Sequence, residues 1–102
     1  MVLDFMGVNI YILRVDFGET TEVDSWDHSR FAGDSELYRD ETIEWEYPDG
    51  PLDEIGIVKR PANWVAFGEW IAMNVPEPNK PRWREAAKMM IEDSKLFLQF
   101  VS

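Results

Sequence analysis

The chain contains no cysteine, a single histidine and no long apolar run. The lack of cysteine excludes disulfides, thiolate catalysis and cysteine-based zinc sites, and it fits a reducing cytoplasm. A Ser-His-Asp triad would have to use His28, and no Gly-x-Ser-x-Gly motif accompanies it. The apolar stretch near the N-terminus has no basic residues before it, and Arg14 and Asp16 follow closely. We therefore expect neither a signal peptide nor a membrane span, which needs about 20 apolar residues.

Motifs that carry chemistry are also missing. No glycine-rich phosphate loop is present, and Asp24, Asp27 and His28 match no known spacing of metal ligands. Glu44 and Glu46 could serve glycosidase chemistry only in two different environments, but residues two apart on a strand share one environment. We therefore expect no catalytic residue, no cofactor and no metal, and a protein that is not an enzyme.

Basic residues are scarce in the first half of the chain. The net charge is −10, and residues 16–54 hold 14 acids against only Arg30 and Arg39, whereas residues 55–102 hold 5 acids and 7 bases. Direct binding of nucleic acid requires a basic surface, so we do not expect it. The bases around the predicted helix starts are expected to balance the acidic face within the fold or between subunits: Lys59, Arg60, Lys80, Arg82 and Arg84.

Alternation of apolar residues predicts strands in the first 60 residues. Residues 8–17 are apolar on both faces and predict a central strand, and Gly18 offers a turn to a hairpin partner at 20–26. In that partner, strict alternation would place Thr21, Val23 and Ser25 opposite Glu22, Asp24 and Trp26. A further strand at 42–47 would place Ile43, Trp45 and Tyr47 in the core and Thr42, Glu44 and Glu46 in water. A Pro-Asp-Gly turn then leads to an antiparallel strand at 54–59.

After Pro61 the spacing of apolar residues changes from the alternation typical of strands to the spacing typical of helices. Asn63 is a good N-cap for a helix whose apolar stripe is Trp64, Phe67, Ile71 and Val75. Since Val65, Trp70 and Met73 are apolar too, we expect this helix to be buried on most sides. A second helix begins near Pro81 and continues over 82–101, with Trp83, Ala87, Met90, Ser94, Phe97 and Val101 as its stripe. Residues 95–101 could instead form a terminal strand, because short apolar runs are ambiguous.

The predicted architecture is a single α+β domain over residues 1–102. An antiparallel sheet of three to four strands in the N-terminal half packs against two C-terminal helices, because strands come first and helices last.

The acidic face suggests a function. Carboxylates on a rigid sheet can imitate a phosphate backbone and occupy a basic groove, with electrostatically steered and salt-sensitive association. We therefore expect a small acidic inhibitor of the immunity, anti-restriction or anti-CRISPR type. Its partner would be a basic protein such as a nuclease, a toxin or a CRISPR effector, and it would act in the cytoplasm, that of the host if phage-encoded. The expected partner-binding residues are Glu22, Asp24, Trp26, Asp27, Tyr38, Asp40, Glu41, Glu44, Glu46 and Asp49.

The alternative is a structural or adaptor subunit without catalytic activity. In that case exposed aromatic residues such as Trp26, Phe31 or Tyr38 would anchor a partner. The apolar C-terminal helix could equally pair two subunits in a homodimer.

Overall fold

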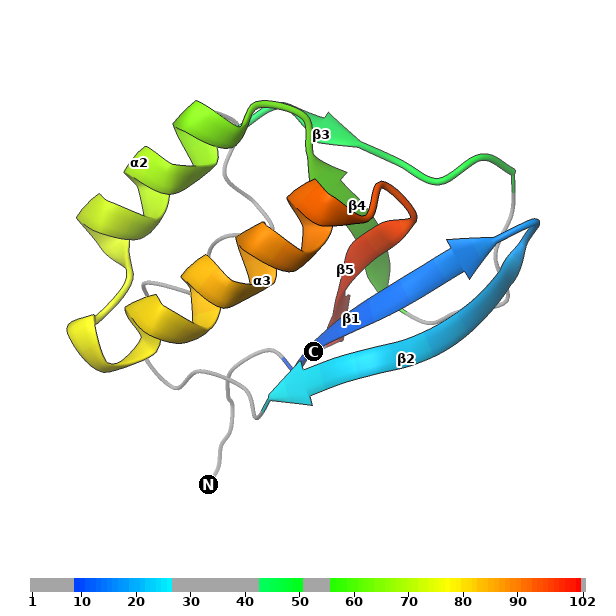
Figure 1. The fold of residues 1–102 in the computed structure, drawn as a ribbon, viewed down its shortest axis with the longest axis horizontal. Helices are drawn as coiled ribbons and strands as arrows, with labels where there is room; N and C mark the ends of the chain where they lie inside the picture. Colours follow the sequence, from blue (N-terminus) through cyan, green and yellow to red (C-terminus); the bar gives the residue numbers. More distant parts are fainter. Residues whose placement is uncertain (1–8, 27–42, 51–55, 102) are drawn as a thin grey trace, which may run out of the picture.

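The computed structural model describes residues 9–26, 43–50 and 56–101. The elements in chain order are β1 (Asn9–Asp16), β2 (Glu19–Trp26), β3 (Trp45–Glu46), β4 (Ile57–Pro61), α2 (Trp64–Asn74), the short 3-10 helix η2 (Glu77–Asn79), α3 (Lys80–Glu92) and β5 (Leu96–Val101). The described strands form one antiparallel sheet in the order β2-β1-β5-β4-β3. In Figure 1, α2 and α3 lie side by side against this sheet. The α+β class is therefore confirmed, with five strands in place of three or four.

The first hairpin follows the sequence pattern closely. β1 lies between β2 and β5, as expected for a strand that is apolar on both faces. Ile10 and Ile12 contribute to the core beneath the helices. The connection is the two-residue turn Phe17-Gly18, in which both residues have positive φ, 54° and 82°. Two positive φ values match the twist of the flanking strands, so this turn closes the hairpin tightly.

The third strand is shorter than the pattern indicated, whereas β4 covers residues 57–59 of the predicted strand 54–59 and continues to Pro61. Of residues 43–47, the described part of the expected strand 42–47, Trp45 and Glu46 pair with β4, and that pairing is antiparallel as predicted. Ile43 is buried and the Trp45 ring packs edge-on against Phe100, 6.3 Å between centroids. Tyr47 is 62% exposed, so its predicted place in the core is wrong. The pairing between β3 and β4 ends before Tyr47, so strand pairing does not fix the side on which the Tyr47 side chain lies.

Helix α2 begins where the capping signal placed it. The Asn63 side-chain oxygen accepts a hydrogen bond from the Ala66 N–H at 3.1 Å, which satisfies one of the free amides of the first turn. The predicted stripe faces the core, with Phe67 and Ile71 buried. Burial on most sides, however, is wrong: Val65 is 72% exposed and Met73 is 83% exposed. The helix rests on one side of the domain, so its outer face stays in water.

Helix α3 ends at Glu92, and the following residues form β5. The structure thereby decides the open question about residues 95–101 in favour of the strand, and the helical stripe through Phe97 and Val101 is wrong. β5 pairs with β1 on one side and β4 on the other. Its backbone is therefore satisfied on both sides, and Leu96, Leu98 and Phe100 enter the core. No described helix is long and apolar enough to cross a membrane.

Candidate protein-binding surface

The predicted partner-binding acids do not form one wall. Glu22 and Asp24 lie on β2, whereas Glu44, Glu46 and Asp49 lie on or beside β3. These two strands are the opposite edges of the sheet as described, with β1, β5 and β4 between them. Four inter-strand steps separate them by about 19 Å. The carboxylates therefore form two groups, one at each edge.

A bulge divides the acids of the β2 edge. Asp24 pairs with Ile12 and Glu22 pairs with Leu13, so Val23 is the extra residue between them. Because Ile12 and Leu13 point to opposite faces, Asp24 and Glu22 do so as well, and the predicted common face of Glu22 and Asp24 is not formed. Glu22 is exposed to water, and it has no ion pair within the described residues.

The β3 edge keeps its carboxylates exposed. Glu44 accepts a long hydrogen bond, 3.5 Å, from the side-chain amide of Asn63. Glu46 is 3.8 Å from the Nε of Arg60, near the limit of an ion pair, and its side chain is 62% exposed. Asp49 follows the strand and is exposed. This edge therefore presents acids whose bonds to the rest of the fold are weak.

Several predicted residues lie outside the part of the chain that the structure describes. These are Asp27, Tyr38, Asp40 and Glu41, together with His28 and Phe31, while β2 ends at Trp26, whose side chain is likewise not described.

One of the bases expected to balance the acidic segment, Arg82, pairs with it, and so does Lys95, which was not among the expected bases. Lys95 Nζ is 3.2 Å from the Asp16 carboxylate, and Arg82 is 3.3 Å from that of Asp24. Arg82 also donates to the Ser25 carbonyl. The side chains in both ion pairs remain about half exposed, so each pair contributes only about 0–1 kcal/mol. Their effect is to neutralise charge rather than to hold the fold together.

Lys59 and Arg60, expected among the surface bases, are buried instead. Lys59 is directed over the Trp45 ring, with Nζ 4.1 Å from the ring centroid. Burial lowers the pKa of Lys59 below its ordinary value of 10.5, since a buried ammonium loses its water. Neither side chain can therefore add to a basic surface.

Arg60 joins the end of α3 to the start of β5. Its guanidinium donates hydrogen bonds to the carbonyls of Met90 (2.8 Å), Asp93 (3.2 Å) and Leu96 (2.9 Å). Burial lowers the pKa of Arg60, and the nearby carboxylates of Glu46 and Asp93 oppose this effect. Since an arginine stays protonated in proteins, the charge remains and strengthens the three bonds.

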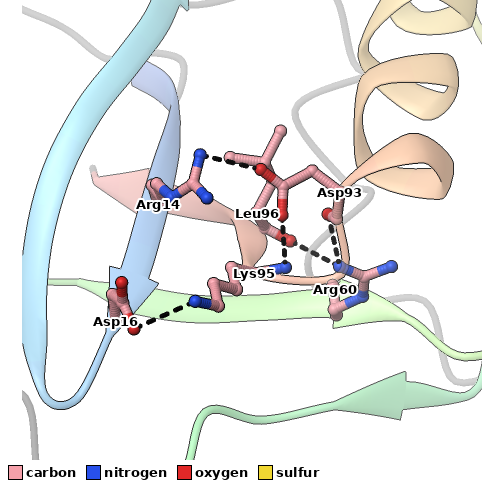
Figure 2. Close-up of polar contacts among 6 residues, drawn as sticks. All are labelled: Arg14, Asp16, Arg60, Asp93, Lys95 and Leu96. Carbon is pink, nitrogen blue, oxygen red and sulfur yellow. Dashed lines mark hydrogen bonds and ion pairs between the residues drawn. The ribbon is translucent and has the colours of Figure 1, made fainter.

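Asp93 forms the other half of this junction (Figure 2). One carboxylate oxygen accepts the Lys95 N–H at 3.0 Å, and the other is 3.0 Å from Arg14 on β1. The Asp93 carbonyl accepts the Leu96 N–H, which closes a turn. Contacts from β1 and β4 therefore direct residues 96–101 away from the helical path.

The pairing leaves an excess of acid on the surface of the described residues. Exposed carboxylates remain at both sheet edges: Glu19, Glu22, Glu44, Glu46 and Asp49. Of the bases that the structure describes, all but Arg84 and Lys88 are buried or ion-paired with a carboxylate.

Within residues 9–26, 43–50 and 56–101, no three acidic or histidine side chains gather as they would around a metal ion. No protein-family model, no curated protein and no solved structure matches the chain.

Proposed function

We propose that this protein is a small acidic inhibitor that binds the basic surface of a nucleic-acid-handling protein, such as a nuclease, a toxin or a CRISPR effector. The observation that carries the proposal is that most described basic side chains are buried or ion-paired within the fold. Lys59 and Arg60 are buried, and Arg82 and Lys95 meet acids of the sheet. Among the residues that the structure describes, the exposed carboxylates of the sheet edges have no ion pair or only a weak one, and we infer that they are available to cations of a partner.

The edges of the sheet suit this role physically. Strand backbones fix the spacing of the Cα atoms that carry Glu22 and Glu46, and each exposed glutamate side chain then loses only its own rotamer freedom when a partner binds. Exposed carboxylates attract a basic surface over roughly the Debye length, about 8 Å at physiological ionic strength. Association would therefore be fast at low salt and would slow steeply as salt is added. A chain without cysteine suits an inhibitor that acts in the cytoplasm.

The separation of the two edges makes the proposal more specific. A partner that contacts the β3 edge need not reach the β2 edge, which lies about 19 Å away across the sheet. We expect the β3 edge to dominate, because Glu44 and Glu46 lie two residues apart there and the best cation of that edge, Arg60, is turned inward. Asp49 lies farther along the chain, in a pocket lined also by Phe17 and Lys95. Glu22 would add long-range attraction only.

The test is affinity for a panel of basic nucleases as a function of salt. The wild type should bind at least one member, and the affinity should fall steeply as salt rises. The double charge reversal Glu44→Lys with Glu46→Lys should weaken that binding at least tenfold, a loss of about 1.4 kcal/mol.

The matched control reverses two charges elsewhere. Glu69 on α2 and Glu85 on α3 are exposed, and neither has an ion pair among the residues described. The double variant Glu69→Lys with Glu85→Lys changes the net charge equally but leaves β3 untouched. Equal losses in both double variants would show that net charge matters and that the β3 edge is no specific contact surface.

An adaptor function is the second candidate, and one observation favours it. Phe17 is fully exposed at the tip of the β1–β2 hairpin, and φ there is 54°, which a bulky residue rarely adopts. Aromatic anchors are enriched at binding hot spots. An interface built on Phe17 would resist salt, and affinity that is unchanged by salt but lost in Phe17→Asn would favour the adaptor.

A further inference from the structure

Among the described residues, the two exposed cations without an ion pair lie one helical turn apart on α3. Arg84 and Lys88 are exposed residues of α3, and no ion pair joins either of them to an acid in the described part of the chain. They are four residues apart, so they lie on one face of the helix with a rise of about 6 Å between them. On a protein of net charge −10, this local positive pair is an exception.

Both cations line a groove between α2 and α3, whose volume is about 300 Å³. Apart from Arg84, Lys88 and Glu92, its lining is apolar: Trp64, Phe67, Gly68, Ile71, Ala87 and Ile91. Phe67 and Ile71 are buried, so they form the floor. A groove of this size lies at the small end of the range for organic ligands, and such sites often lie between helices.

The floor of the groove is built from aromatic rings that pack against one another. The Phe67 ring meets the Trp64 ring edge-on at 5.9 Å between centroids and the Trp83 ring at 6.1 Å. Trp83 is buried. A ligand would therefore meet a preformed apolar surface and would lose little affinity to reorganisation of the protein.

Gly68 keeps the groove open. A Cβ at this position would meet no atom within 4 Å, so the fold itself does not require glycine there. Glycine in a helix interior is less stable than alanine by about 1 kcal/mol. The exposed side chain of Ile91 adds apolar surface to the same groove, at 58% exposure.

We propose that this groove binds a small organic monoanion with a carboxylate head and an apolar aliphatic or aromatic body. The α2–α3 hairpin is antiparallel (Figure 1), which places Arg84 toward the Ile71 end and Glu92 toward the Trp64 end. The carboxylate binds between Arg84 and Lys88, and the apolar body extends along Gly68 toward Trp64. Glu92 repels a second negative charge at that far end, so dianions are excluded.

A second copy of this chain is a poorer occupant. Two molecules of net charge −10 repel each other before contact. A groove lined by nine residues is also smaller than the surface of about 800 Å² per partner that a stable dimer buries.

The test compares three probes that share an eight-carbon chain: octanoate, 1-octanol and octylammonium. Each is titrated into the intact protein, and backbone amide shifts are followed by NMR, with the Gly68 amide as the main reporter. Octanoate should shift Gly68 and Ala87 and bind at least tenfold more tightly than octanol. Octylammonium should bind more weakly than octanol.

Variants separate the head from the body of the ligand. Arg84→Gln with Lys88→Gln should remove the preference for octanoate, whereas Arg82→Gln, a cation outside the groove, should leave it. Gly68→Leu should fill the groove and abolish binding of both octanoate and octanol. Ala72→Leu, an exposed change on the same helix outside the groove, should not.

Three results would overturn the proposal. These are no amide shift at millimolar octanoate, equal affinity for octanoate and octanol, and shifts of the groove amides on dilution of the protein alone. The last result would show that a second copy occupies the groove. Because the acidic sheet edges take no part in this site, failure here leaves the proposed inhibitor function unaffected.

Discussion

Replacing Arg60 with Met should destabilise the protein by about 3 kcal/mol. The variant keeps an apolar stem of similar length but removes the donors to three backbone carbonyls. The bonds to Met90 and Leu96 are buried, and each acceptor left without a donor costs about 1–3 kcal/mol. Removing a buried charge returns part of this loss, which is why we expect the lower half of the summed range.

Urea denaturation measures this change, and hydrogen exchange locates it. For a domain of about 100 residues, 3 kcal/mol lowers the melting temperature by more than ~10 °C. In Arg60→Met, hydrogen exchange should speed up relative to wild type, and it should speed up more for the amides of β5 than for those of α2. The reason is that Arg60 fixes the junction between α3 and β5.

Two controls make the result specific to this geometry. Arg60→Lys keeps the charge but replaces a planar guanidinium with a single ammonium. This variant should therefore still lose most of the stability that the Arg60 hydrogen bonds provide. Arg82→Gln removes an exposed arginine and should change stability by less than about 1 kcal/mol. If Arg60→Met unfolds at the same urea concentration as wild type, our account of the junction is wrong.

Three further substitutions probe stability. Phe17→Asn should stabilise the protein by about 1 kcal/mol in urea denaturation, because asparagine tolerates a φ of 54° far better than phenylalanine does. A destabilised variant would show that the Phe17 backbone is not strained. Lys59→Met should change how the stability of the protein depends on pH. Because the pKa of Lys59 is lowered in the folded state, the unfolded state binds more protons than the folded state at pH values between the lowered pKa and 10.5. The stability of wild type relative to Lys59→Met should therefore rise as pH increases from neutral toward 10.5, and a falling difference would refute this. Gly68→Ala should raise the melting temperature by an amount corresponding to at most about 1 kcal/mol, whereas a lower melting temperature would mean that the site is not open.

Local signals in the sequence were sufficient to place the first hairpin and the start of α2. Residues 9–16 carry apolar side chains on both faces, and Asn63 is a capping residue just before the apolar stripe begins. These features depend on neighbours in the chain, so sequence patterns predict them. The bulge at Val23 and the exposure of Tyr47 depend on pairing with other strands, and no local pattern indicated either.

The last strand could not be assigned from local pattern alone. Leu96–Val101 is apolar enough for a helix or a strand, and the decision comes from β1, β4 and Arg60, all distant in sequence. Asp93 and Ser94 are a local signal for a turn at this point, since short polar side chains favour turns over helix interiors.

The place of β5 also explains why the acids were predicted as one surface. With the sheet confined to the N-terminal half, β2 and β3 would lie closer together. β5 instead inserts between β1 and β4 and becomes the middle strand, which moves the two acidic strands to opposite edges. The exposure of Glu22, Glu44, Glu46 and Asp49 was predicted correctly, whereas their mutual arrangement depended on that one insertion.

The central claim is that the β3 edge is a contact surface for a basic protein. The most direct measurement is the affinity for a basic nuclease that binds the wild type, followed over a range of salt for wild type, Glu44→Lys with Glu46→Lys, and Glu69→Lys with Glu85→Lys. We predict a steep fall with salt for the wild type, and at least a tenfold weaker affinity for the β3 variant alone at low salt. A wild-type affinity that does not change with salt, or a β3 variant that binds as tightly as wild type, would contradict the claim.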